Sequence, residues 1–365
     1  MILYQHPHIV MRRLIFIQII LSVFIAVPAF GQNDTIVNPY AASDTLLQDF
    51  GLFGKDDVLE LSLRFDITHY TRNKSKDEYL DALLTYHINK NDSINKEIKL
   101  KSRGEFRNKY CQFPPISLNF KKTEFSKPDL NKIETIKLVT HCEYGNEDYL
   151  FREYLIYKLY NVLTENSFRV RLIKINYINT YKKSKPISSY AFLIEPLNLL
   201  SERTNTTPVN MANLNQKNIL PEMMNRVAIF NYMIGNTDWS VPGQHNCKIL
   251  TRKEMDRPEL GSIVPYDFDY SGLVNAYYAI PYEPLGLKNV RERRYLGVCR
   301  SEEVFINALK EFTSKKEEFY RIINEFPLVT AKSKKDMISF LDTFYRGIDN
   351  HNSIVSDMHS ECKVF

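Results

Sequence analysis

Apolar and polar residues alternate along the first half of the chain. Leu59, Leu61 and Leu63 are separated by polar residues, and a period of two is typical of a β-strand with one buried face. Asn91-Asp92 predicts a turn. The same alternation predicts further strands, at residues 82–88, 98–100, 116–120, 136–138, 169–178 and 189–194. These segments together predict an antiparallel β-rich region.

A helical period replaces this alternation in several places. Apolar residues recur on one face from residue 147 to 163, and Asn146 is placed to cap this helix. Pro221 begins a second helix and Gly235 ends it, because Pro is favoured in the first helical turn and Gly just past the last. After about residue 300 the apolar stripes are again helical. Two strands follow the second helix, at residues 247–250 and 263–266.

This order of elements predicts an α+β protein in two parts. Residues 51–195 form a β-rich N-lobe with one helix, and residues 196–365 form a mainly helical C-lobe that begins near Glu195. Residues 32–50 are expected to be a flexible lead-in, and the stretch 201–218 is polar. A hydrophobic content of 44% excludes a mainly disordered chain.

The N-terminus has the features of a cleavable secretory signal peptide, residues 1–31. Arg12 and Arg13 precede the apolar run Leu14–Val27, and the small-residue site Ala29-Phe30-Gly31 follows. The run is shorter than the ~20 apolar residues of a membrane-spanning helix, so we expect no transmembrane anchor after cleavage. The residue directly after the predicted cleavage site is Gln32 and not a Cys, so a lipid anchor of the lipoprotein kind is not indicated. The sequence therefore predicts a periplasmic or secreted protein.

Cysteine content and charge add two constraints. Five cysteines in a compartment that permits disulfides leave at least one thiol unpaired or paired between chains, and Cys111 with Cys142 is a candidate disulfide. No CxxC occurs, which disfavours a zinc knuckle. Loss of Arg12 and Arg13 lowers the net charge of +5 by two, which is too weak a charge to indicate a nucleic acid partner.

Side chains with potential chemistry are concentrated between residues 235 and 269. If the strands 247–250 and 263–266 form a hairpin, Asn246 and Asp267 meet at its open end beside Asp238. Carboxylate and amide oxygens suit Mg²⁺ or Mn²⁺. Because Asp267 and Asp269 alternate at a strand end, only one of them is expected to face the site.

This order of motifs resembles the catalytic segment of atypical kinases of the spore-coat CotH type. The resemblance rests on IGNTDWSVPGQHN, VPYDFDYSG and motif order over roughly residues 100–275. The wider run from Arg103 to Gly272 is also similar to a family of exported bacterial proteins without an assigned activity. The CotH resemblance implies a bilobal protein-kinase-like fold that binds Mg²⁺ or Mn²⁺ with ATP or another nucleotide.

The resemblance also implies roles for the C-lobe residues. Asp238 would be the catalytic base that takes the substrate proton, and Asn246 and Asp267 would be the metal ligands, with Asp269 as a second ligand.

Further roles fall on the phosphate-binding side. Lys137 would contact the phosphates while paired to Glu153 on the following helix, the loop at Arg103 would cover the phosphates, and Ile194-Glu195 would form the hinge.

Each of these residues also has a purely structural interpretation. Asp238 can cap a turn, and Lys137 with Glu153 can be an ordinary surface pair. Trp239 is expected in the core rather than at the rim of a ligand site, and His245 is more simply a satisfied structural group than a ligand.

Two other functions remain open. Asp238 and Asn246 lie eight positions apart, farther than in an ordinary kinase catalytic loop, and the chain has no GxGxxG. With little ATP outside the cell, these features favour a catalytically inactive periplasmic binding or scaffold protein of the cell envelope. A third function is a metal-dependent phosphoesterase, because residues 235–238 resemble a GNHD box in which Thr237 replaces the His. The partner would be an envelope or extracellular protein, or a small phosphorylated ligand.

Overall fold

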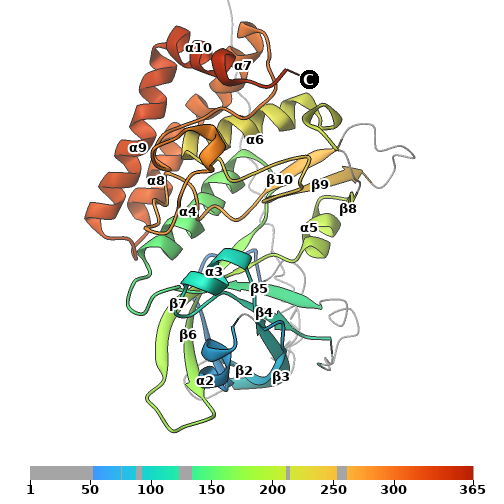
Figure 1. Cartoon of the computed structure of the whole chain (residues 1–365), viewed down its shortest axis with the longest axis vertical. Coiled ribbons are helices and arrows are strands. Elements are labelled where there is room, and N and C mark those ends of the chain that lie inside the picture. Colours follow the sequence, from blue (N-terminus) through green and yellow to red (C-terminus); the bar gives the residue numbers. More distant parts are fainter. Residues whose placement is uncertain are drawn as a thin grey trace, which may run out of the picture. The chain divides into compact units, whose positions relative to one another are not determined.

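Seven strands of the N-terminal half close into a barrel (Figure 1), whose order is β1-β2-β3-β4-β5-β7-β6. All the predicted strands of this region are present. Their bounds are β1 Leu59–Phe65, β2 Leu80–His87, β3 Ser93–Ser102, β4 Ile116–Asn119, β5 Thr135–Val139, β6 Val170–Asn179 and β7 Ile187–Ile194. Leu61, Leu63 and Phe65 are at most 1% exposed, so the alternation in β1 identified the inner face of the barrel.

The closure of the barrel differs from the predicted antiparallel arrangement. Most neighbouring strands are antiparallel, but β1 pairs with β6 in parallel, with Leu61 opposite Ile175. Alternation fixes which side of a strand is buried and does not fix which distant strand lies beside it. The α+β class itself is confirmed.

The computed structural model describes residues 52–74, 76–87, 93–121, 123, 134–210, 214–252 and 261–364. The predicted leader, the lead-in 32–50 and the Asn91-Asp92 turn lie outside these residues. The described residues all belong to one compact unit, which spans Asn38–Phe365.

Two short helices lie in connections of the barrel, α2 Ile67–Arg72 and α3 Glu105–Tyr110. The sequence did not predict either, because six residues are too few to establish a helical period. Gly104 precedes α3 with a φ of 84°, in the region that favours glycine. Cys111 ends α3 and forms the predicted disulfide with Cys142.

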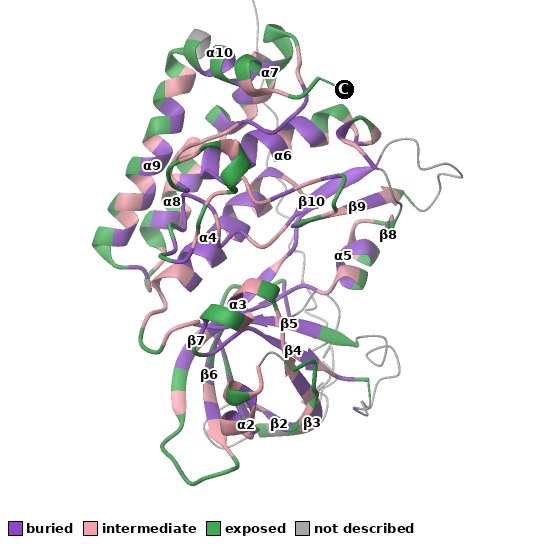
Figure 2. Ribbon diagram, in the orientation of Figure 1, coloured by how far each residue is buried: buried purple, intermediate pink, exposed green. Residues whose placement is uncertain are grey.

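The long helix α4, Asp148–Leu163, is buried on nearly all sides (Figure 2). It contacts β6 and β7 of the barrel as well as helix α8, Lys316–Glu325. A helix enclosed in this way needs apolar residues around its circumference rather than on one stripe. The predicted cap at Asn146 is wrong: the N-cap residue is Glu147, without a side-chain capping bond.

The second half is mainly helical, as predicted. Helix α6 begins at Pro221, and Gly235 ends it with a φ of 66°. A Cβ at Gly235 would lie 2.9 Å from the Phe340 ring, so the position requires glycine on two grounds. The elements are α5 Leu197–Arg203, β8 Thr206–Pro208, η3 Gln216–Asn218, α6 Pro221–Ile234, β9 Cys247–Arg252, β10 Ser262–Pro265, η4 Glu283–Leu285, α7 Glu302–Ser314, α8, α9 Ala331–Asp349 and α10 His351–Glu361.

The described residues form two hydrophobic clusters. One fills the barrel. The other surrounds α4 and α6 and takes in the hairpin and the C-terminal helices, together with Val170 and Phe192 from the barrel wall. Helix α4, which the sequence placed in the N-lobe, therefore shares its core with the C-terminal helices.

Four of the five cysteines form disulfides. Cys299 pairs with Cys362 in addition to the Cys111–Cys142 bridge, and Cys247 is free and buried, so the expected unpaired thiol is present. Disulfides persist in oxidising compartments, so the two bridges indicate an oxidising, extracellular environment. Within the described ranges, no helix combines the length and apolar character needed to cross a membrane.

Candidate active site

The hairpin of β9 and β10 brings two separate segments together, as predicted. Cys247 pairs with Pro265 across the hairpin, and the Tyr266 backbone nitrogen donates to the Asn246 carbonyl at 3.0 Å. Asn246 and Asp267 therefore flank its open end. Both have positive φ, 50° and 64°. Such strained conformations in non-glycine residues cluster at functional sites.

Asp238 is held at this end of the hairpin by two side chains. Its Oδ1 lies 2.8 Å from His245 Nε2, and its Oδ2 accepts a hydrogen bond from Asn246 Nδ2 at 2.9 Å. The Asp238 side chain is 36% exposed. The carboxylate is therefore both oriented and reachable from solvent. Trp239, next in the chain, is buried, as expected of a core residue.

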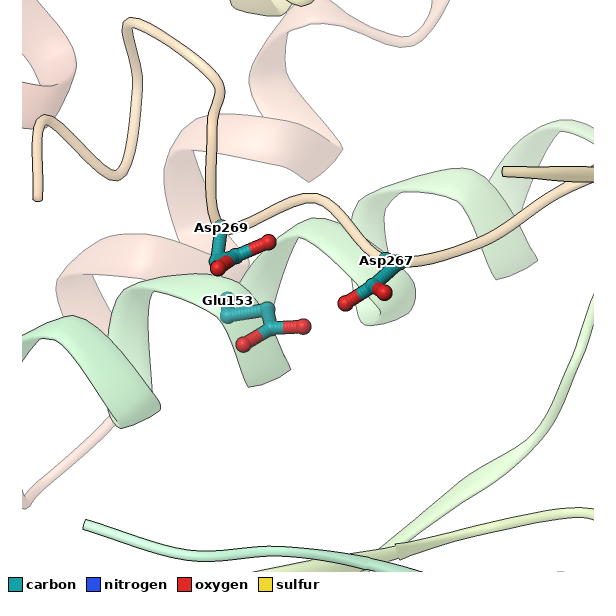
Figure 3. Close-up of side chains that lie close together, drawn as sticks. All are labelled: Glu153, Asp267 and Asp269. Carbon is teal, nitrogen blue, oxygen red and sulfur yellow. The ribbon is translucent and has the colours of Figure 1, made fainter. Parts of the chain in front are cut away.

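Three carboxylates converge beside the hairpin (Figure 3). Glu153 on α4 faces Asp269 and Asp267 on the loop after β10, and one oxygen from each lies within 4.8 Å of the others. The expectation that only one of the two aspartates faces the site is wrong. Strand β10 ends at Pro265, and the positive φ of Asp267 turns the chain so that both carboxylates approach Glu153. This group could hold a metal ion.

The guanidinium group of Arg107 lies among these carboxylates. Its Nη2 is 2.6 Å from Glu153 and 3.6 Å from Asp267, and its Nε is 2.8 Å from Asp269. Of the ion pairs between described residues, none joins Glu153 to Lys137, so the predicted pairing is corrected. The reason is the unpredicted helix α3, which places Arg107 against α4.

Burial and positive charge act in opposite directions on the three carboxyl groups. Burial raises the pKa of Glu153 to about 8, although Arg107 opposes this effect. Burial also raises the pKa of Asp269. For Asp267, burial acts in the same direction, but Arg107 and the neighbouring cations outweigh it and lower its pKa. Asp267, whose side chain is 35% exposed, is therefore the ionised carboxylate that faces outward.

Two lysines face one tyrosine beside Asp267. The Nζ atoms of Lys137 on β5 and Lys248 on β9 lie 4.5 and 5.6 Å from the centre of the Tyr266 ring. Burial lowers the pKa of Lys137 to about 8, and Arg103 adds to this shift while Asp267 opposes it. Neither lysine makes an ion pair with a residue that the structure describes, and the same is true of the Arg103 side chain.

Both lysines and Tyr266 line a cavity of about 910 Å³. This volume is within the range of small-molecule sites, roughly 300–1,000 Å³. Ile194 and Glu195, the residues predicted to form a hinge, also line it. Glu195 is already neutralised by Arg203, at 2.9 Å.

Sequence reasoning missed Arg107 and Lys248. Arg107 lies only four residues after Arg103, but nothing in the local pattern indicates that α3 turns it toward α4. Lys248 falls inside a predicted strand, and alternation does not show which groups its side chain meets across the sheet. Only tertiary structure reveals these two cations.

Comparisons with known proteins do not assign this chain to a family. No family model matches the chain, and no curated protein matches it. One similar solved structure is the crystal structure of a Helicobacter pylori proinflammatory kinase, CtkA. It is 12% identical over 77% of this chain and 91% of that chain, with a TM-score of 0.34. A likeness of this degree assigns no function.

Proposed function

We propose that this protein is an exported, bilobal, kinase-like protein that binds a phosphate-bearing ligand and a divalent metal ion at the open end of the β9–β10 hairpin. One observation carries the proposal. Lys137 and Lys248 line a large cavity without an ion-pair partner among the described residues, next to the ionised Asp267.

The positive charges around Tyr266 favour an anionic ligand. Burial of an ammonium group without an ion-pair partner is unfavourable, and the lowered pKa of Lys137 reflects this cost, which the charge of Asp267 offsets only in part. Arg103 brings a third positive charge close to Lys137. A ligand with several negative charges relieves the repulsion among these groups. Lysine and arginine are common partners of phosphate, so a nucleotide fits the site.

Asn246, Asp267 and Asp269 are the proposed ligands of Mg²⁺ or Mn²⁺. Their hard oxygen atoms suit both ions. When bound, such an ion neutralises negative charge on a transferring phosphoryl group. On the protein side, the Asn246 amide nitrogen bonds to Asp238 and so fixes the orientation of the amide.

Asp238 is the proposed proton acceptor. A substrate hydroxyl gives its proton to the Asp238 carboxylate while the hydroxyl oxygen bonds to the terminal phosphorus. The bond from this phosphorus to the bridging oxygen breaks, and a nucleoside diphosphate leaves. His245 and Asn246 hold the carboxylate in position for this step.

Export and partners are part of the same proposal. The predicted leader and the two disulfides support a periplasmic or secreted location. The acceptor is then an envelope or extracellular protein, or a small molecule, and the phosphate donor must be present in that compartment.

A second candidate is a binding protein without transfer activity. Arg107 already supplies a positive charge among Glu153, Asp267 and Asp269, where an active kinase-like site would place its metal. The two candidates share the ligand site and differ only in the chemical step.

The test compares ligand binding with transfer. We expect Mn²⁺ with a non-hydrolysable ATP analogue to raise the melting temperature of the wild-type protein, and Lys137→Met to abolish the rise. Lys174→Met, an exposed lysine on β6, is the matched control and should leave the rise intact. Asp238→Asn should bind the analogue and lose transfer if the protein is an enzyme. An absence of any shift with nucleotide, pyrophosphate or phosphate would rule out both candidates.

A further inference from the structure

We infer that Glu153 is itself a ligand of a divalent cation, in a site with Asp267 and Asp269 that Arg107 holds together. The inference rests on the proposed metal site at Asp267 and adds Glu153 to its ligands. It assigns to Glu153 a direct bond to the ion in place of an ion pair with a lysine.

The carboxylate geometry fits one ion. The three oxygens lie within 4.8 Å of one another. Oxygens that share an ion at 2.0–2.6 Å are separated by at most about 4–5 Å, so all three can reach a common centre. Figure 3 shows Glu153 on helix α4 close to Asp269 and Asp267, which both lie on one loop.

Glu153 has an unused oxygen at this place. Its Oε2 accepts from Arg107, but its Oε1 is buried and has no hydrogen-bond partner among the described residues. The Glu153 side chain is 2% exposed. A buried carboxylate oxygen without a partner is unfavourable, and a cation is the partner that this oxygen lacks.

Charge balance also indicates a divalent ion. If binding of the ion ionises all three carboxyl groups, three negative charges face the single guanidinium of Arg107. A divalent cation brings the total to neutrality, which a buried group of charges requires. Asp267 is the most exposed member of the group and gives the ion a route from solvent.

Arg107 is a positioning residue in this site. It binds one oxygen of Glu153 and one of Asp269, which fixes both side chains and leaves their other oxygens for the ion. The disulfide at Cys111, directly after α3, restrains the segment that carries Arg107.

Calorimetric titration with Mn²⁺ alone tests the inference. We expect Glu153→Gln to weaken Mn²⁺ binding by at least about tenfold, because it removes a ligand charge and keeps the side-chain shape. Asp148→Asn is the matched control on the same helix: it also loses an ion-pair partner, Arg152 at 2.8 Å, and should bind Mn²⁺ like the wild type.

A second pair of variants separates positioning from folding. Arg107→Met should weaken Mn²⁺ binding, and Arg107→Lys should restore part of the affinity. If Glu153→Gln does not fold, Glu153→Asp replaces it, with the same expected loss.

Two results overturn the inference: wild-type affinity for Mn²⁺ in a folded Glu153 variant, or no Mn²⁺ binding by the wild-type protein. Pyrophosphate binding without metal, and its loss in Lys137→Met, tests the anion site separately. Failure of the metal inference therefore remains distinguishable from failure of the proposed function.

Discussion

The ammonium nitrogen of Lys137 lies 4.5 Å from the centre of the Tyr266 ring. Attraction between a cation and an aromatic face compensates part of the cost of burying the ammonium group. The Nζ atom of Lys248 lies 5.6 Å from the centre of the same ring, so the uncharged Tyr266 ring interacts with two cations. The two ammonium groups around this ring have no ion-pair partner among the described residues, and the first two predictions follow from this arrangement.

Lys137→Met should stabilise the protein while it removes anion binding. The variant loses a charge that burial disfavours, so we expect the free energy of unfolding to rise by about 1 kcal/mol, or roughly 2–4 °C in melting temperature. Stability gained at the expense of function is typical of a binding residue. Thermal unfolding and pyrophosphate titration measure the two effects. A destabilised variant with unchanged affinity would show that Lys137 is structural.

Anion affinity should fall as the pH rises from 7 to 9. The pKa of Lys137 is about 8, so its ammonium group loses its proton in this range, whereas an ordinary lysine keeps it to about pH 10. Binding of an anion favours the charged form, so the complex should take up a proton near pH 8. Titration calorimetry in two buffers with different ionisation enthalpies measures this uptake. Lys174→Met, the exposed control on β6, keeps the pH dependence, and a flat profile for the wild-type protein contradicts the assignment.

His141 should make the protein sensitive to acid. The residue is 3% exposed, neither ring nitrogen has a described partner, and burial lowers its pKa from the ordinary 6.5 to about 4. The unfolded chain therefore binds a proton that the folded chain does not. Stability contributed by the neutral ring is complete above pH 6.5 and is lost as the pH falls toward 4, by up to about 3 kcal/mol.

His141→Phe tests this account of acid sensitivity. The ring of His141 lies 5.2 Å from that of Phe113 at an interplanar angle of 16°, so a phenyl ring can take its place. We expect the variant to match or exceed wild-type stability at pH 7 and to show a smaller loss between pH 6.5 and 4.5. Equal losses in denaturant titrations of both proteins would assign the acid sensitivity to other groups.

Loss of the Cys299–Cys362 disulfide should destabilise the protein. The bridge closes a 63-residue separation between the chain before α7 and the end of α10. Removing it from the oxidised protein should cost about 2–5 kcal/mol. Calorimetry of a Cys299→Ala, Cys362→Ala double variant measures the cost, with Cys247→Ala as the control that leaves both bridges intact. An unchanged melting temperature in the double variant would contradict the prediction.

Local patterns correctly predicted the barrel strands, the long helix α4, helix α6 and the pairing of β9 with β10. The alternation around Leu61 identified the inner face of a strand, and Pro221 and Gly235 marked the ends of α6. The hairpin that brings Asn246 beside Tyr266 also followed from the sequence, because neighbouring strands with a short connection usually pair. These features depend on residues close together in the chain.

Features that depend on distant residues were not predictable. The parallel pairing of β1 with β6 depends on how the barrel closes and leaves no local pattern. Glu153 pairs with Arg107 and not with the predicted Lys137, because a six-residue helix orients Arg107 toward it. In both cases hydrophobic periodicity determines which face is buried, and the identity of the neighbour comes from tertiary packing.

The most direct test of the central claim is the anomalous scattering of Mn²⁺ in crystals grown with Mn²⁺ and pyrophosphate. The account predicts one Mn²⁺ peak about 2.2 Å from an Asp267 carboxylate oxygen, with the phosphate groups between this ion and the ammonium group of Lys137. The account is contradicted if strong Mn²⁺ and phosphate density is present elsewhere but no Mn²⁺ lies beside Asp267 and no phosphate lies beside Lys137.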